Sequence, residues 1–363
     1  MSKEFDIIVI GAGIAGASVA AHLAETHRVA ICEMEEQPGY HTTGRSAAMY
    51  EPNYGPPPML ALTRAAGAAF RDGGFLTPRD TIFFAPDDQE QAFARLMGIQ
   101  KGMREISVAE ARRRFPHLKE GYARNAVLDE GTADIDVDAL HQHYLKLLRQ
   151  RGGELHCERP VQALHRNGLW TVSAGGDTLR SRIIVNAAGA WGDSVAELAG
   201  LKPVGLQPKR RSMAVVPGPE GTDIMQWPMV GDVGETWYCK PQSGKLLISP
   251  ADATPVDPHD AYADDMTLAE GIERFSHAVN YEVTRVERSW GGLRSFAPDG
   301  NPVVGYDALM EGFFWLIGQG GFGIQSAPAL SRLAAALVRG QDAPADILDE
   351  GLVLADIAPQ RFG

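Results

Sequence analysis

A glycine-rich loop near the start of the chain constrains the fold more than any other feature of the sequence. The loop, residues 11–16 with the sequence GAGIAG, directly follows the apolar run 7–10. A segment with helical spacing comes next, and its apolar face is formed by Ile14, Ala17, Ala20, Ala21 and Leu23. A strand, a glycine turn and a helix in this order predict the first half of a dinucleotide-binding βαβ unit.

An acidic residue stands where such a unit binds ribose. The second predicted strand, residues 28–32, ends in Glu33, 17 residues after Gly16, near the spacing expected for a ribose-binding carboxylate. Gly11 permits the tight turn, Gly13 lets the backbone approach a pyrophosphate, and Gly16 lets the helix pack closely on the strand. The helix N-terminus offers N–H groups and a partial positive charge to the phosphates. The alternative is a structural turn followed by a surface glutamate.

Size and charge limit the classes of function. A chain of 363 residues can bury a large core, and we expect two closely connected domains. The net charge of −12 disfavours a nucleic-acid partner, because neutralising phosphates requires a basic face. We interpret the basic cluster 112–114 as a solvated helix face. No apolar run approaches membrane-spanning length, so we expect no integral membrane segment.

The cysteines and the start of the chain predict a cytoplasmic protein. Three widely spaced cysteines form no Cys-x-x-Cys pair, which fits buried thiols in a reducing compartment. Residues 1–6 lead straight into the first strand, so we expect no signal peptide. We also expect no metal site, because His141 and His143 lie two apart on a predicted helix and face different directions.

Short apolar runs alternate with helical segments, which indicates an α/β protein. Helices are predicted at about 87–97, 136–149, 266–278 and 324–338, the second with Asp136 as its N-cap. Strands are predicted at 81–84, around 161, and at 170–172, 182–185, 211–216, 237–240 and 246–249. The small residues 186–191 would let a backbone approach a ligand at the carboxyl end of a strand.

The segment 39–48 is too polar and too rich in glycine for a core element. Its hydroxyl groups, Arg45 and a helix start predicted at Ser46 would suit a second contact with phosphate. An ordinary loop is the alternative.

A second glycine-rich loop, residues 318–323 with the sequence GQGGFG, follows the apolar run 313–317 and precedes the predicted helix 324–338. It therefore lies at another helix N-terminus, which is useful where negative charge develops. A reduced flavin carries such charge near N1 and O2 of its ring, whereas nicotinamide does not become anionic on reduction. The second loop thus favours FAD over NAD.

Stretches from end to end of the chain resemble the D-amino-acid oxidase, glycine oxidase and sarcosine oxidase family of FAD enzymes. The most specific are 206–212 (LQPKRRS) and 186–191 (NAAGAW), and others are 11–16, 37–48, 133–142, 292–296 and 319–325. The narrower resemblance is to bacterial D-arginine-type dehydrogenases. The family implies a Rossmann-like FAD-binding domain of the glutathione-reductase type with an inserted, mainly antiparallel β substrate domain. We assign 1–75, 136–205 and 291–363 to the first domain, and 76–135 and 206–290 to the second.

The resemblance also implies the residues of both sites. FAD would contact the first loop at Gly11, Gly13, Ala15 and Gly16, and further residues at Glu33, Met34, Thr42, Thr43, Gly44, Arg45, Ser46, Ala47, Ala48, Met49, Val161, Gly320, Gly321, Phe322, Gly323, Ile324 and Gln325. Arg211 and Arg294 would bind the substrate carboxylate, with Tyr54 and Tyr238 lining the site and the Gly321 carbonyl near the amine. A planar carboxylate suits guanidinium better than ammonium, although any single arginine could equally be a surface residue.

The family implies oxidative deamination of D-amino acids. Hydride passes from Cα to flavin N5, and the imino acid hydrolyses to a keto acid and ammonia. A quinone, another acceptor or oxygen takes the electrons. None of the cysteines lies where sarcosine-oxidase-like relatives tether FAD, so we expect non-covalent FAD. A glycine or sarcosine-type amine oxidase and a flavin-binding subunit without its own turnover stay open as alternatives.

The sequence departs from the family at the position that selects cationic substrates. Members with that selectivity place an acid where Thr81 stands, and the neighbouring Asp80 would point to the opposite face of a strand. Met49 replaces a histidine, and Glu51 stands where an uncharged residue is typical. We expect a weakened preference for arginine and a preference for apolar or small D-amino acids. Alternatively, Glu51 or Asp80 replaces the missing acid.

Overall fold

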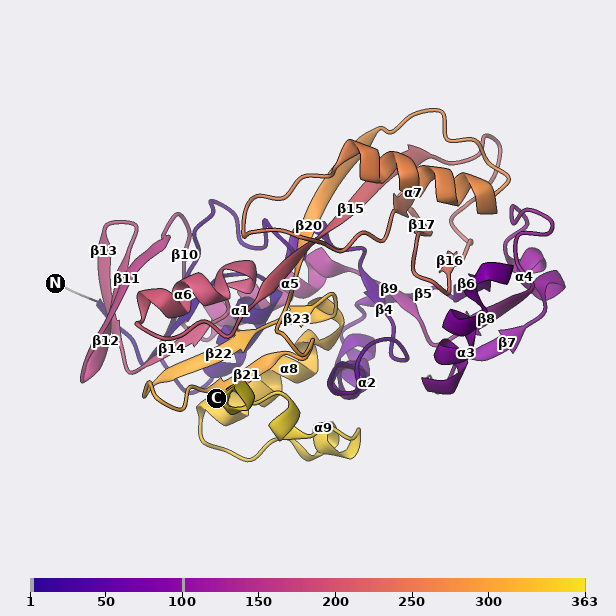
Figure 1. Ribbon diagram of the computed structural model, residues 1–363. Helices are drawn as coiled ribbons and strands as arrows, with labels where there is room; N and C mark the ends of the chain where they lie inside the picture. The colour runs from indigo at the N-terminus through magenta and orange to yellow at the C-terminus, as the bar shows by residue number, and fades with distance from the viewer. Residues whose placement is uncertain (1–2, 100–101, 363) are drawn as a thin grey trace.

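A six-stranded sheet organises the half of the protein that holds the first glycine loop, in a computed structural model that describes residues 3–99 and 102–362 (Figure 1). Its strands are parallel except for the antiparallel edge strand β21. Their order is β10 (Glu154–His156), β3 (Val29–Cys32), β2 (Ile7–Ile10), β14 (Ile183–Asn186), β22 (Phe313–Ile317) and β21 (Val303–Tyr306). Strands β2, β3 and β22 are buried throughout, as expected for a parallel sheet covered on both faces.

Helices cover one face of this sheet and a smaller sheet covers the other. One core joins alternate residues of β2, β3 and β22 to α1 (Ile14–Leu23), α2 (Pro57–Asp72), α5 (Val137–Gln150) and α8 (Gly323–Val338), with α9 (Ala345–Asp349) packed on α2. The opposite core contains α6 (Gly192–Leu198) and the sheet β1 (Lys3–Glu4), β13 (Asp177–Ser181), β12 (Leu169–Ala174) and β11 (Val161–Asn167). Because β-strand residues alternate between faces, each strand contributes to both cores.

A ten-stranded, mainly antiparallel sheet forms the other half (Figure 1). Its order is β23 (Gln319–Gly320), β20 (Arg288–Phe296), β15 (Gln207–Pro217), β18 (Lys245–Ser249), β17 (Tyr238–Gln242), β16 (Met229–Asp232), β6 (Thr81–Ala85), β8 (Asn125–Asp129) and β7 (Arg104–Ile106), with β19 (Thr254–Pro255) beside β15. Helix α7 (Asp265–Ala278) packs on β15 and β18, α3 (Glu90–Ile99) on β6, and α4 (Val108–Arg114) on β8. This mixed α/β architecture agrees with the predicted fold class.

Short elements complete the chain. A three-stranded sheet, in the order β4 (Met49–Tyr50), β9 (Ala133–Ile135) and β5 (Leu76–Pro78), lies on the path between the two halves. Single 3-10 turns are η1 (Thr43–Arg45), η2 (Asp87–Gln89), η3 (Gly189–Trp191), η4 (Leu354–Asp356) and η5 (Pro359–Phe362). The domain boundaries stay a prediction, and β20 runs across the one placed at 290/291.

The predicted helices and strands are present with small shifts at their ends. Asp136 caps α5 by accepting a hydrogen bond from the Ala139 N–H at 2.9 Å, as predicted. The segment 87–97 begins as the 3-10 turn η2 and becomes α-helical at Glu90. The basic cluster on α4 is not simply solvated, because Arg114 lies 2.6 Å from Asp80 and 3.0 Å from Glu130.

Buried charges connect the three-stranded sheet to the ten-stranded sheet. The Asp134 carboxylate on β9 accepts hydrogen bonds from Lys240 Nζ at 2.5 Å and from Arg79 Nε at 2.6 Å. The Lys240 and Arg79 side chains are only 3% and 7% exposed. Lys240 also donates to the Ala47 carbonyl at 2.9 Å, so this triad fixes the polar segment 42–49 against β17.

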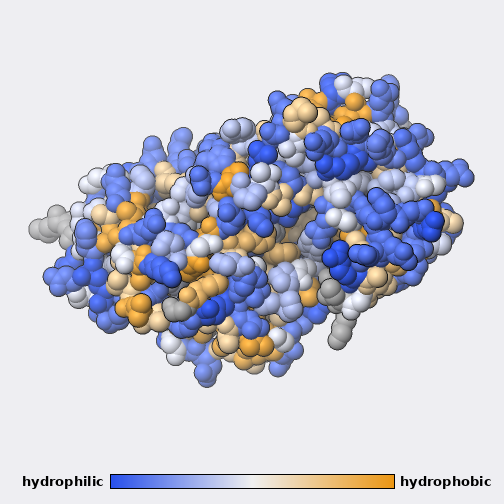
Figure 2. Space-filling view, in the orientation of Figure 1, coloured by the Kyte–Doolittle hydropathy of each residue, from blue (hydrophilic) through white to orange (hydrophobic). Residues whose placement is uncertain are grey.

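Hydrophilic residues cover most of the visible face, and apolar residues reach it in scattered patches (Figure 2). Among the helices in residues 3–99 and 102–362, none has both the length and the apolar character needed to cross a bilayer.

Removing the shared acid of the triad tests its contribution to stability. We expect Asp134→Ala to lower the free energy of unfolding by about 3–5 kcal/mol, because it leaves two buried cations without their partner. The control Asp346→Ala, which breaks the exposed pair with Arg332, should cost less than about 1 kcal/mol. Equal losses in equilibrium denaturation of the two variants would contradict this assignment.

Candidate active site

A cavity of about 350 Å³ lies where the carboxyl ends of β2, β3 and β14 meet the ten-stranded sheet. Ligands of open α/β sheets bind at this edge. The cavity extends from the first glycine loop to the second, so one space joins two segments about 300 residues apart in the chain. Of the residues predicted for the two sites, all line it except Gly16 and Gly44.

The first glycine loop is packed too closely for side chains. Gly11 has a φ of +99°, and a Cβ there would lie 2.6 Å from the Ala187 carbonyl oxygen. A Cβ on Gly16 would lie 1.9 Å from the Gly11 carbonyl oxygen. Gly16 therefore supports the loop from behind, and the N-terminus of α1 comes close to the cavity at Gly13 and Ala15.

Glu33 is buried at the same end of the cavity and is only 7% exposed. Its carboxylate accepts hydrogen bonds from the Ala12 N–H at 2.6 Å and from the Glu35 N–H at 3.0 Å. A carboxylate has about four acceptor positions, so two remain for the hydroxyl groups of a ligand. The alternative of a surface glutamate is wrong. The His141 side chain also contacts the loop, since its Nε2 lies 2.9 Å from the Ala12 carbonyl oxygen.

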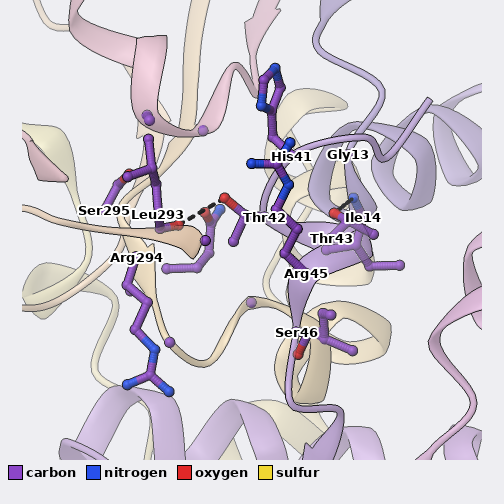
Figure 3. Close-up of a pocket in the computed structure, with 18 of the residues that line it drawn as sticks. Gly13, Ile14, His41, Thr42, Thr43, Arg45, Ser46, Leu293, Arg294 and Ser295 are labelled. Carbon is purple, nitrogen blue, oxygen red and sulfur yellow. Dashed lines mark hydrogen bonds between the residues drawn. The ribbon is translucent and has the colours of Figure 1, made fainter. Parts of the chain in front are cut away.

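The polar segment joins both halves through its hydroxyl groups. Thr42 donates to the Leu293 carbonyl at 2.7 Å, and Thr43 accepts from the Ile14 N–H at 3.0 Å (Figure 3). The helix predicted at Ser46 is wrong, because the 3-10 turn η1 ends before Ser46 and the chain continues through an irregular stretch into β4 at Met49. Arg45 lines the cavity, but its guanidinium is 2.5 Å from Asp260 and donates to the Ala261 carbonyl.

The second glycine loop closes the opposite end of the cavity. It follows β22, and α8 begins within it at Gly323. A Cβ on Gly321 would lie 2.8 Å from Arg294 Cζ, and one on Gly320 would lie 2.5 Å from the Phe296 ring. Gln325 Oε1 accepts the Glu51 N–H at 2.9 Å, whereas the buried Gln325 Nε2 has no acceptor among the described residues. This donor is available to a ligand.

Two arginines, Arg211 and Arg294, line one wall of the cavity. Arg211 on β15 pairs with Gly292 on β20, and Arg294 pairs with Lys209, so the arginines are diagonal neighbours on one sheet face. Burial, and next the charge of Arg294, lower the pKa of Arg211. Arg211 Nε donates to the Asp252 carbonyl at 2.7 Å, but the Arg294 side chain forms no hydrogen bond or ion pair with another described residue. Figure 3 shows the Arg294 side chain extending away from Thr42 and Thr43.

The predicted tyrosines flank the arginines. Tyr54 donates its hydroxyl to Glu235 at 2.8 Å, and its ring centre lies 5.7 Å from that of Phe322. Burial, and next the charge of Glu235, raise the pKa of Tyr54, so its phenol stays neutral. The Tyr238 hydroxyl is 3.3 Å from Met213 Sδ, and its ring lies 5.9 Å from Arg211 Cζ.

Asp80, Thr81 and Glu51 are the positions where an acid could select a cationic substrate. Of these three residues, only Glu51 lines the cavity. Asp80 points away and is paired with Arg114. Thr81 is fully buried and donates to Thr132 Oγ1 at 3.1 Å. Asp80 therefore does not replace the acid missing at Thr81, and Glu51 remains the candidate for that role.

Sequence reasoning missed the apolar lining contributed by the ten-stranded sheet, which includes Phe83, Met213 and Met229. Met213 had a usable signal, since it lies two residues after Arg211 and therefore on the same strand face. The other two come from strands whose pairing the sequence does not specify.

Cys32 also lines the cavity, at the end of β3, and burial raises its thiol pKa to about 12. Cys157 and Cys239 have free thiols as well. Within residues 3–99 and 102–362, no group of three His, Cys, Asp or Glu side chains is arranged to hold a metal ion.

Comparison with known proteins identifies a family that matches most of the chain. A family described as "DAO: FAD dependent oxidoreductase" matches residues 6–337. The hydrogen cyanide synthase subunit HcnC of Pseudomonas aeruginosa is 23% identical, with 96% of this chain and 95% of that protein covered. A glycine oxidase of Geobacillus kaustophilus is 24% identical, with 96% of each chain covered.

Solved structures share the fold. The crystal structure of that glycine oxidase has a TM-score of 0.83 at 23% identity, covering 97% of this chain and 99% of its own. The L-proline dehydrogenase of P. horikoshii has a TM-score of 0.84 at 21% identity, covering 100% and 98%. This likeness confirms the predicted fold class, a Rossmann-like FAD-binding domain combined with a mainly antiparallel substrate sheet.

The cavity fits FAD, the cofactor of the matched family. A close-packed glycine turn and a buried acid lie at one end, and the unpaired Gln325 Nε2 and the N-terminus of α8 lie at the other. A pyrophosphate and ribose suit the first set, and a ring that gains negative charge on reduction suits the second. That FAD is held without a covalent bond stays a prediction.

Proposed function

Because the chain belongs to the DAO family of FAD-dependent oxidoreductases, we propose that it oxidises α-amino acids at the amine, and that its substrates are D-amino acids. The D configuration rests on the resemblance of 206–212 and 186–191 to D-amino-acid-oxidising enzymes. The specific likeness to D-arginine-type dehydrogenases belongs to this proposal. The oxygen assay described below decides between a dehydrogenase and an oxidase.

The pair Arg211 and Arg294 carries the proposal. Two guanidinium groups on one cavity wall repel each other unless an anion lies between them. Their planar donor sets suit a carboxylate. Arg294 lies beside Gly321, at the end of the cavity that suits the flavin ring, and Arg211 is its diagonal neighbour on the sheet. A carboxylate bound there would hold the adjoining Cα near the ring.

The protein's own part in the reaction is positioning. Bound FAD would supply the acceptor for a hydride from Cα of the substrate. Arg211 and Arg294 would fix the carboxylate, and the Gly321 carbonyl would accept a hydrogen bond from the amine. Met213, Met229 and Phe322 would exclude water around the reacting atoms. The imino acid product would hydrolyse in water to a keto acid and ammonia.

We propose that small or apolar D-amino acids are preferred. Methionine and phenylalanine side chains line the substrate end, and neither Asp80 nor Thr81 offers an acid to a cationic substrate. Oxidation of glycine or a secondary amine is the second candidate, favoured by the full-length similarity to a glycine oxidase. The similarity to HcnC, a synthase subunit, keeps a role as a flavin-binding subunit as a further alternative.

Flavin bleaching without oxygen tests the activity. We expect D-methionine, D-phenylalanine and D-leucine to reduce the flavin faster than D-arginine and their L-isomers. Reduction by glycine or sarcosine alone would favour the second candidate, and no bleaching by any amine would favour the subunit. A clear preference for D-arginine would contradict the proposed selectivity. Repeating the assay with oxygen separates an oxidase from a dehydrogenase.

The variant Arg294→Met tests the carboxylate clamp. Two charge-assisted hydrogen bonds of about 1.5–3 kcal/mol each are lost, so kcat/KM should fall at least about 100-fold. The protein should stay yellow, because FAD binding relies on other contacts. The control is Arg288→Met on the same strand, where the side chain is exposed. Equal kinetics in both variants would refute the clamp.

A further inference from the structure

The proposed reaction requires the amine of the substrate to lose a proton before hydride leaves Cα. Near neutral pH the amine of an amino acid is an ammonium group with no free electron pair. Hydride can leave Cα only when the nitrogen lone pair is free to form the C=N bond. A group beside the bound amine that accepts this proton lets the abundant ammonium form react, and an acceptor works best when its pKa lies near the working pH.

Few groups in the substrate half of the cavity can accept that proton. Tyr54 is a neutral phenol, and the Glu235 carboxylate beside it is already occupied by the Tyr54 hydroxyl. The Asp232 carboxylate is already occupied by the backbone N–H and hydroxyl of Thr236 and by Gln89. The cavity's one histidine among the described residues, His41, lies at the other end with Glu35.

Glu51 differs from these groups because its carboxyl is unoccupied. It follows β4 and lines the cavity, and its backbone N–H is bound to Gln325 at the start of α8. Within residues 3–99 and 102–362, its side-chain oxygens accept no hydrogen bond and form no ion pair. The carboxyl therefore shares the cavity wall with Arg294 and has free acceptor positions.

The surroundings of Glu51 set its proton affinity. Burial raises its pKa from 4.5 to about 7, and the nearby carboxylate of Asp129 adds to this. Charged or titratable groups face it from several elements, namely Asp129 at the end of β8, Arg294 on β20, Glu235 after β16, Lys240 on β17 and Tyr54 beyond β4. Arg294 and Lys240 oppose the rise. The group is therefore ionised above about pH 7 and protonated below it.

Resting on the function proposed above, we infer that Glu51 is a further catalytic residue that accepts the proton from the substrate ammonium. The N–H bond breaks and its proton passes to the Glu51 carboxylate, leaving its electron pair on nitrogen. That pair then forms the C=N bond as the Cα–H bond breaks and hydride, with both electrons, passes to FAD. The substrate is oxidised by two electrons and FAD is reduced by two, and Glu51 later returns its proton to water.

The test follows anaerobic flavin reduction from acidic to alkaline pH, with the amino acid that reduces the wild-type protein fastest. The wild-type rate should rise with pH through about 7, because only the ionised carboxylate accepts a proton. In Glu51→Gln the rate at neutral pH should fall by about 10²–10⁴-fold, the usual contribution of a general base. The difference should close at alkaline pH, where the substrate amine is already neutral.

Two further variants and one spectrum keep the test independent of folding and of substrate. Glu51→Asp retains a carboxylate and should recover part of the rate with a neutral-range profile. Glu36→Gln, an exposed acid outside the cavity, should match the wild type. Without substrate, the wild-type protein should show an infrared band of a protonated carboxyl that disappears as the pH rises through about 7. This band should be absent from Glu51→Gln.

Each other outcome overturns the inference. An unchanged pH profile in Glu51→Gln means that Glu51 takes no proton. A change in KM alone means that it only binds the ammonium, and an effect confined to D-arginine and D-lysine means that it binds a cationic side chain. In all three cases the proposed function stands. If no amino acid reduces the wild-type flavin, the proposed function fails and the inference fails with it.

Discussion

The contact between Gly16 and Gly11 is the constraint on which the site depends. Any side chain on Gly16 would overlap the Gly11 carbonyl, and any on Gly11 would overlap the backbone at Ala187. Only with both glycines can α1 pack on β2 closely enough for its N-terminus to face the cavity. The strand beyond, β14, then lies beside β2, and β22 follows it. The second glycine loop therefore reaches the same cavity because the sheet order places β22 there.

Charge is distributed unevenly along this cavity, and the distribution matches the ligands proposed for it. A buried glutamate and a helix N-terminus lie at one end, where ribose and phosphates are expected. Arg211 and Arg294 lie at the other, together with the acid Glu51. An amino acid carries both charges a few bonds apart, so a cation pair beside an acid suits it better than it suits a simple anion.

Local features were predictable from the sequence, and features set by strand pairing were not. The first loop, Glu33 and the Asp136 cap are encoded within short segments, and all were found. The roles of the arginines came from family resemblance, whereas their diagonal placement depends on the register of β15 and β20. The Lys240–Asp134–Arg79 triad joins residues far apart in the chain and had no local signal. The helix expected at Ser46 does not form, because Ala48 has a left-handed φ of +63° and the strand β4 begins at Met49.

The central claim is that one cavity holds FAD with its ring beside Gly320–Gln325 and a carboxylate between the two arginines. A crystal structure of the protein with FAD and a simple carboxylic acid that lacks an amine tests it most directly. We predict the carboxylate within hydrogen-bonding distance of both Arg211 and Arg294, next to the flavin ring. A ring at the Glu33 end, or a carboxylate bound away from both arginines, would contradict the account.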